Sequence, residues 1–300
     1  MKSSYSPRTP DMGRSRAFTL VEVLVVIAII SVLMAVLLPA LSKARECAYL
    51  TGELTAGREL GQAHRMYAGD YNSYYMAGFA SATMVAQRAV IAKDQKGDVL
   101  TGLPAQRYPW RLLPYFEYDL ASWYRNRDAI EKALNVTGDF NSEQYHYAVS
   151  VAPRMGLNQT FIGGSADTDG GGYAFNPAYQ AQTSAAWGNN WYCKRVSDLN
   201  RAAEIIIFAT SFGSDPVGKV TLDGLYRISP PYFLARKWTT NRPDSTTAPG
   251  QIGGVSFRYS GRAAASMGDG HCETYNWDEM QDMRHWSPQA NAPDWKLKPL

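Results

Sequence analysis

The hydropathy pattern begins with one long apolar run near the N-terminus. From Phe18 to Leu38 the sequence is FTLVEVLVVIAIISVLMAVLL, in which Glu22 is the one charged residue. A helix of this length spans about 30 Å at 1.5 Å per residue, which matches the thickness of a bilayer core. The run therefore predicts a transmembrane helix over residues 18–38.

An amphipathic pattern follows the apolar run. Beyond Pro39, apolar and small residues recur at spacings of three and four until about Ala68. They are Leu41, Ala44, Cys47, Ala48, Leu50, Leu54, Gly57, Leu60, His64 and Tyr67, and the charged residues placed mostly on other faces are Lys43, Arg45, Glu46, Glu53, Arg58, Glu59 and Arg65. We expect the helix to continue over residues 39–70. Because proline removes one backbone hydrogen bond, Pro39 should kink the helix or melt it locally.

The remainder, residues 71–300, has short apolar or alternating runs bounded by Gly, Pro, Asn and Asp. Ala203–Ala209 (AEIIIFA) predicts a buried strand, and Ala121–Leu134 predicts one further helix. The Pro-rich segment Pro230–Pro249 is typical of a long surface loop.

An antiparallel sheet is predicted in the region 253–275. Val255–Tyr259 alternates apolar and polar residues, Ala263–Met267 forms the returning strand, and Asp269-Gly270 is a pair that favours a tight hairpin. The expected fold class is thus α+β: a long N-terminal helix packed on an antiparallel β-sheet, in a globular domain with loop-rich insertions over residues 71–300.

The charge distribution predicts how the helix is oriented in the membrane. The net charge is +3, and residues 1–17 hold Lys2, Arg8, Arg14 and Arg16 against Asp11, which leaves 26 basic and 26 acidic residues in the rest of the chain. By the positive-inside rule the N-terminus lies in the cytoplasm and the chain after Pro39 lies on the other side. The balanced remainder argues against nucleic-acid binding, which needs a clustered basic surface.

Two other interpretations of the N-terminal segment remain open. A cleavable secretory signal also has a basic start and an apolar run, and Ala40-Leu41-Ser42 is a candidate cleavage site. Its apolar region would be shorter and would seldom contain a glutamate. A plain, uncleaved signal anchor is the second alternative.

The sequence RAFTLVEVLVVIAIISVLMAVLLPAL, which begins at Arg16, resembles the N-terminal signature of type IV prepilins and type II secretion pseudopilins. The resemblance implies that residues 1–17 are a leader, that prepilin peptidase cuts between Ala17 and Phe18, and that the new amine of Phe18 is methylated. It also implies that Glu22 serves assembly with other pilin or pseudopilin subunits. Pro39 corresponds to the proline that the family has late in this helix. Ala17 departs from the glycine that is usual before the cut.

A second resemblance lies near the C-terminus. The segment FRYSGRAAASMGDGHCE is similar to the H-X9-DG element of large pilin-like proteins. Asp269 and Gly270 match the element, whereas Tyr259 stands where the element has histidine. The resemblance implies no activity.

No catalytic or cofactor site emerges from the sequence. His271 and Cys272 are adjacent, but neighbouring residues of a strand point to opposite faces and do not readily converge on one metal ion. Asp167-Thr168-Asp169-Gly170 resembles part of a calcium loop, yet the later carboxylate of an EF-hand is absent, so a solvated Gly-rich loop is favoured. We expect no metal and no cofactor.

Cysteines and aromatic residues each leave two interpretations. Cys193 and Cys272 could form a disulfide in an oxidising compartment, which would leave Cys47 as a small helix-packing residue. The clusters Tyr108-Pro109-Trp110 and Trp187–Tyr192 could stack on sugars, but packing in a loop-rich core explains them with fewer assumptions.

These observations predict a structural protein rather than an enzyme: a type IV pilus or type II secretion pseudopilus subunit in a bacterial inner membrane, with its globular domain in the periplasm. The alternative is a membrane-anchored surface protein that binds polysaccharide or a protein partner. An exported enzyme is the third and least supported interpretation.

Overall fold

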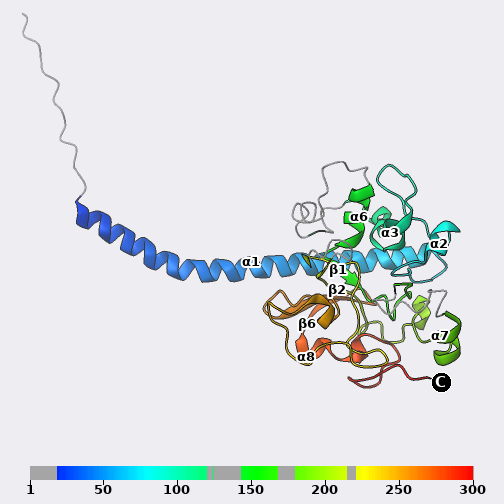
Figure 1. Ribbon diagram of the computed structural model, residues 1–300. Helices are drawn as coiled ribbons and strands as arrows, with labels where there is room; N and C mark the ends of the chain where they lie inside the picture. The colour runs from blue at the N-terminus through cyan, green and yellow to red at the C-terminus, as the bar shows by residue number, and fades with distance from the viewer. Residues whose placement is uncertain (1–18, 120–123, 125–142, 168–179, 215–220, 300) are drawn as a thin grey trace, which may run out of the picture. The chain divides into compact units, whose positions relative to one another are not determined.

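The computed structural model describes residues 19–119, 124, 143–167, 180–214 and 221–299 (Figure 1). The chain divides into two compact units, Met1–Ala48 and Tyr49–Leu300. The helix expected over Ala121–Leu134 lies outside the described residues, apart from Tyr124.

One long helix, α1 (Leu20–Asp70), belongs to both units. Its helical assignment is unbroken through Pro39, so the local melting that we expected there does not occur; a kink stays a prediction. The expected architecture of a long N-terminal helix with an antiparallel sheet is confirmed.

Within the second unit, α1 buries one stripe of its surface. In Figure 1, helices α3 (Gly102–Gln106) and α6 (Glu143–Val151) lie on one side of this part of α1, and the labelled strands lie on the other. The approach to the sheet is close, because a Cβ at Gly61 would stand 2.6 Å from the Ser266 hydroxyl oxygen. The buried residues of the helix are Glu53, Ala56, Gly57, Leu60, Gly61, Ala63, His64, Tyr67 and Ala68.

His64 is the polar centre of this packing. Its imidazole stacks on the Tyr75 ring with centroids 5.2 Å apart and meets Phe208 edge-on. Burial, with the nearby Arg111 guanidinium, lowers the pKa of His64 to about 3. The residue therefore packs as a neutral aromatic ring.

The main sheet has four antiparallel strands in the order β1-β2-β5-β6. They are β1 (Met155–Leu157), β2 (Ile206–Thr210), β5 (Arg262–Met267) and β6 (Cys272–Asn276). Every residue of β2 is buried, which confirms the strand predicted from Ala203–Ala209. Its side chains enter two apolar clusters, because successive residues face opposite sides of a sheet: Ile207 joins the cluster with Leu60 of α1, and Ile206 joins the cluster with Trp277 and Trp286.

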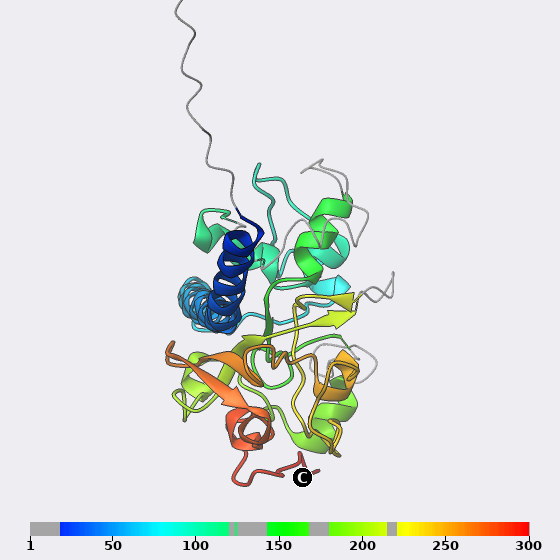
Figure 2. The same ribbon diagram turned by 90° about the vertical axis from the view of Figure 1, so that its left-hand side faces the viewer.

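In the described part of the chain, short helices and a small second sheet make up the rest of the regular structure. The helices are α2 (Ala82–Ala86), α4 (Pro109–Leu112), η1 (Leu113–Phe116), α7 (Gln180–Trp187), η4 (Val196–Asp198), η5 (Pro249–Ile252), α8 (Trp277–Met280) and η6 (Met283–His285). Strands β3 (Gly213–Ser214) and β4 (Thr221–Leu222) pair with each other. Figure 2 shows the β5–β6 hairpin leading into α8, next to which the C-terminal segment runs.

The turn between β5 and β6 contains Asp269 and Gly270, where the hairpin was expected. The Gly270 amide donates to the Met267 carbonyl at 2.9 Å, and Gly270 has φ of +93°. The strand expected over Val255–Tyr259 does not form. That segment is irregular because Gly253 and Gly254 before it, and Ser260 and Gly261 after it, all take positive φ, so it makes only single bridges to Ser211 and Arg262.

The Pro-rich segment buries some of its side chains, although its composition suggested a surface loop. Residues 230–248 contain no helix and no strand, as expected. Phe233 and Trp238 are nevertheless buried, because their rings pack against Phe161 and against Trp277 and Trp286.

The suggested Cys193–Cys272 disulfide is absent, and both residues are free thiols. Cys193 is buried beside Ile162, whereas Cys272 lies on β6 opposite Gly57 of α1, so the two have different neighbours. Burial raises the pKa of Cys193 to about 12 and also raises the pKa of Cys272, which favours the thiol over the more reactive thiolate at both positions. Cys47 is exposed on α1, so the packing role suggested for it is not seen.

Candidate functional site

The apolar part of α1 is exposed along its length. Side chains from Leu20 to Leu41 that would normally be buried face outwards, among them Val23, Ile27 and Leu33. By length and composition α1 is the one helix among the described residues that could cross a membrane. Such a continuous apolar surface needs lipid or other helices around it.

Glu22 is held at the first turn of this helix. Its Oε2 accepts hydrogen bonds of 2.8 Å from both the backbone N–H and the hydroxyl of Thr19. The Glu22 amide in turn donates to the Thr19 hydroxyl at 3.3 Å. This reciprocal arrangement resembles a capping box and turns the carboxylate back towards the N-terminus. Ala17 and Phe18, the predicted cleavage residues, lie outside the described residues.

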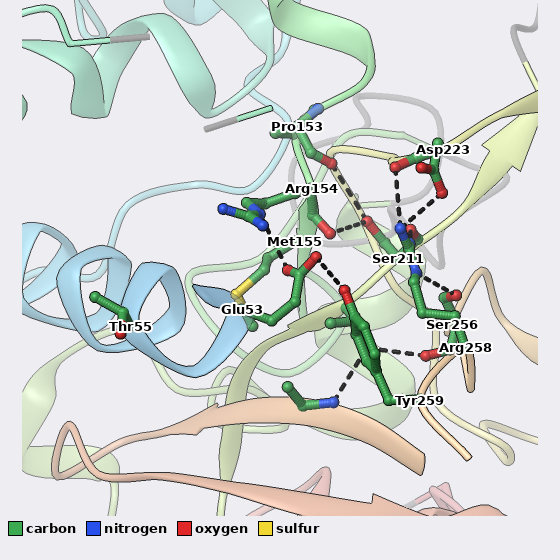
Figure 3. A network of polar contacts seen from close by, with 12 residues as sticks. Glu53, Thr55, Pro153, Arg154, Met155, Ser211, Asp223, Ser256, Arg258 and Tyr259 are labelled. Carbon is green, nitrogen blue, oxygen red and sulfur yellow. Dashed lines mark hydrogen bonds and ion pairs between the residues drawn. The ribbon is translucent and has the colours of Figure 1, made fainter. Parts of the chain in front are cut away.

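A second polar site lies where α1 meets the sheet, and its centre is Glu53 (Figure 3). This side chain is 0% exposed. One carboxylate oxygen accepts from the Arg154 Nε at 3.1 Å, and the other accepts from the Tyr259 hydroxyl at 2.7 Å. Both oxygens of a buried charge are thereby satisfied, as burial requires.

The backbone around Arg154 is tied to Ser211, because the Ser211 amide donates to the Arg154 carbonyl at 3.1 Å. The Ser211 hydroxyl donates to the Leu225 carbonyl at 2.8 Å and accepts from the Leu225 amide at 2.9 Å. Arg258 donates to the Ser211 carbonyl and to the Asp223 carboxylate (Figure 3). These bonds fix the segments that carry Arg154 and Tyr259, so the partners of Glu53 are preorganised.

Twelve residues further along α1, Arg65 makes the second polar contact with the same C-terminal region. Its guanidinium donates to the Asp269 carbonyl and lies over Gly270, where an added Cβ would stand 2.3 Å from the Arg65 Nη2. The Asp269 carboxylate itself accepts from His271, at 3.0 Å from the backbone amide.

The C-terminal segment from Tyr259 to Gly270 thus touches α1 at both of its ends. We call the contacts Tyr259–Glu53–Arg154 and Asp269–Arg65 the helix clasp. The sequence did not indicate Glu53, Arg154 or Arg65 as site residues. A signal existed, because Glu53, Gly57, Gly61 and His64 follow one another at helical spacings on the buried stripe.

Gly270→Val should destabilise the domain. Valine fits φ of +93° poorly, which costs at least about 1 kcal/mol, and its side chain would displace Arg65. A thermal melt of the full-length protein in lipid nanodiscs should show a melting temperature lower by roughly 2–4 °C or more. Gly250→Val is the matched control, because a Cβ there meets nothing within 4 Å. Equal melting temperatures for the two variants would contradict the assignment.

Among the described residues, no cluster of three His, Cys, Asp or Glu side chains suits a metal ion. His271 is partly exposed and contacts Asp269 at 2.6 Å. Asp167, the first residue of the suggested calcium-loop fragment, accepts from the Tyr226 hydroxyl at 2.7 Å and pairs with Arg227. Residues 168–170 of that fragment lie outside the described residues.

Comparison with known proteins gives one match. The family described as the prokaryotic N-terminal methylation motif matches residues 12–38. No curated protein and no solved structure matches the chain. The matched residues include Ala17, Phe18 and Glu22 and end just before Pro39.

The chain therefore carries a prepilin-type cleavage and methylation motif. The motif indicates a type IV pilin-like or pseudopilin-like precursor, and it implies processing by prepilin peptidase and assembly with other pilin subunits. Together with the exposed apolar helix it indicates a membrane-anchored protein of a structural class.

Proposed function

We propose that this protein is a structural subunit of a type IV pilus or of a type II secretion pseudopilus. The observation that carries the proposal is the methylation motif at residues 12–38, which includes the exposed apolar part of α1 from Leu20 to Leu38. A helix with such a surface is stable in a bilayer, and in a bundle of identical helices it can exchange lipid contacts for packing.

The subunit enters assembly from the inner membrane. The basic leader, residues 1–17, stays in the cytoplasm with the cleavage site, residues 18–38 cross the membrane, and the domain that follows is periplasmic. Residues 39–70 continue the helix outside the membrane and connect it to the domain of residues 71–300. Cleavage after Ala17 produces a positively charged amine on Phe18, four residues before Glu22, and a separate methyl transfer then methylates this amine.

In the filament, Glu22 pairs with the Phe18 amine of a neighbouring subunit. A carboxylate at mid-membrane is costly, by about 2.5–3.5 kcal/mol on insertion scales, and less near the interface. The hydrogen bonds from Thr19 stabilise one carboxylate oxygen of Glu22, Oε2, and direct the carboxylate towards the start of the helix. A neighbour's amine can then neutralise the charge where water is scarce.

The helix clasp gives the C-terminal segment a role in this scheme. Tyr259 occupies the histidine position of the H-X9-DG-like element and bonds Glu53, while Asp269 bonds Arg65. These contacts attach the sheet to α1, the helix through which the subunit assembles. The domain therefore enters the filament together with its helix.

Processing should depend on the size of residue 17. Ala17→Gly should leave cleavage intact or improve it, and Ala17→Trp should block it, because the residue before the cut must fit a pocket for small side chains. Coexpression with a prepilin peptidase and separation of precursor from mature protein by gel mobility measure this. Equal cleavage of Ala17→Trp would contradict a size-limited pocket.

Recovery of the protein in sheared surface fibres distinguishes a filament subunit from a membrane-anchored surface protein. A pilus subunit is recovered in the fibre fraction and crosslinks helix to helix through cysteines introduced in residues 18–38. A surface protein that only borrows the export route remains in the membrane fraction as a monomer.

A further inference from the structure

A surface cavity outside the helix clasp has the composition of a ligand site. It measures about 600 Å³ and is formed by two segments, residues 187–190 and 289–298. This volume falls within the range of small-molecule sites. The lining residues are Trp187, Gly188, Asn189, Asn190, Gln289, Asn291, Trp295, Lys296, Leu297 and Lys298.

The two tryptophans of the cavity are half-buried and held in place. Trp187 meets the Trp191 and Phe233 rings edge-on, with centroids 5.6 Å and 5.4 Å apart. Trp295 meets Phe161 in the same way at 6.0 Å. Because these supporting rings are buried, the tryptophans keep fixed orientations and present rigid aromatic surface to the cavity.

Hydrogen bonds also fix the walls. The Gln289 side-chain amide donates to the Asn190 carbonyl at 2.6 Å and joins the two segments. The Leu297 amide donates to the Phe233 carbonyl at 2.8 Å and anchors the C-terminal wall. The cavity is therefore preformed, which lowers the entropic cost of binding.

The polar lining suits a ligand rich in hydroxyl groups and negative charge. Side-chain amides both donate and accept hydrogen bonds, as sugar hydroxyls do, and Asn189, Asn190 and Asn291 place three of them at the cavity. Lys296 and Lys298 are cationic, and none of the described lining residues is acidic. The flat aromatic faces complement the C–H faces of sugar rings.

We propose that this cavity binds an acidic polysaccharide, with sugar rings stacked on Trp187 and Trp295 and carboxylates near Lys296 and Lys298. Sugar stacking and core packing were both open for the Trp187–Tyr192 cluster: Trp191 and Tyr192 are buried in the core, whereas Trp187 is half-buried and lines the cavity. The site involves no residue of α1, so it is independent of the assembly mechanism.

Isothermal titration of the full-length protein tests the site. The protein is held in lipid nanodiscs, since sugar-based detergents would compete, and is titrated with tetramannuronate, uncharged mannotetraose and hexaglutamate. Tetramannuronate should bind most tightly. Trp295→Ala should weaken its binding roughly tenfold, and Lys298→Ala should weaken it about three- to fivefold while changing mannotetraose binding little.

Two variants at residues that do not line the cavity serve as controls. Tyr74→Ala removes an exposed aromatic ring and Lys96→Ala an exposed lysine, and both should bind tetramannuronate as the wild type does. Melting temperatures identify any variant that fails to fold, and Asn291→Asp, which keeps the side-chain size, then replaces it and should weaken binding by charge repulsion. Absence of tetramannuronate binding, unchanged binding by the cavity variants, or equally tight binding of mannotetraose or hexaglutamate would overturn the proposal.

Discussion

Glu22→Leu is expected to leave membrane insertion and cleavage intact and to remove the protein from assembled fibres. Leucine makes the helix more apolar, so insertion is favoured, and the leader and the Ala17–Phe18 bond are unchanged. What is lost is the carboxylate that pairs with a neighbour's Phe18 amine. Breaking one partner of a buried ion pair costs about 3–5 kcal/mol, which corresponds to a loss of incorporation of more than about a hundredfold.

The fraction of protein recovered in sheared fibres, divided by the mature protein in membranes, measures this effect. Glu22→Gln keeps the shape and the Thr19 bonds but removes the charge, so it should fail nearly as severely as leucine. Glu22→Asp should be partly tolerated. Thr19→Val is the control, because it removes both hydrogen bonds of the Thr19 hydroxyl with Glu22, at 2.8 Å to Oε2 and at 3.3 Å from the amide, without changing the charge. Normal incorporation of Glu22→Leu would contradict the pairing mechanism.

Arg154→Met is expected to destabilise the domain more than any other single change in the helix clasp. The substitution keeps much of the apolar stem but leaves the fully buried Glu53 carboxylate without its cation. The cost should be about 3–5 kcal/mol. Tyr259→Phe removes one hydrogen bond of 2.7 Å and should cost about 1–3 kcal/mol.

Thermal unfolding of the full-length protein in lipid nanodiscs measures both changes. Arg242→Met is the matched control, because Arg242 and Asp278 also form a pair at 3.2 Å but are 71% and 73% exposed. Exposed pairs contribute about 0–1 kcal/mol, so the control should melt almost as the wild type does.

A combined variant separates burial of charge from loss of packing. Replacing Glu53, Arg154 and Tyr259 together by Leu, Met and Phe removes every polar group of that contact and should recover most of the lost stability. If Arg154→Met melts like Arg242→Met, or if the combined variant is less stable than Arg154→Met, Glu53 is not the buried charge that holds the contact together.

The elements that the sequence predicted correctly are those with strong local patterns. The helix Leu20–Asp70 follows from an apolar run and a helical period, and β2 follows from the run Ile205–Phe208, which is rich in β-branched residues. The hairpin at Asp269-Gly270 follows from turn chemistry, because glycine adopts positive φ without strain.

The sequence-based predictions that were wrong concern residues whose structure depends on tertiary contacts. Val255–Tyr259 alternates like a strand, yet flanking residues at positive φ turn the backbone and send Tyr259 to Glu53 on α1. Glu53 was placed on another face of the helix because it is charged, although its spacing to Gly57 and Gly61 put it on the buried stripe. Its partner Arg154 is 101 residues away, and no local pattern reports such a pair.

Mass spectrometry of the mature N-terminus, on protein isolated from native membranes, determines whether the chain is processed as a prepilin. We expect a chain that begins at Phe18 with a methylated amine, because the resemblance to prepilins implies a cut after Ala17, within the matched motif. A chain that begins at Met1 would indicate an uncleaved anchor. A chain that begins beyond Leu38 would indicate a cleaved secretory signal, and either result would contradict assembly through the Phe18–Glu22 pair.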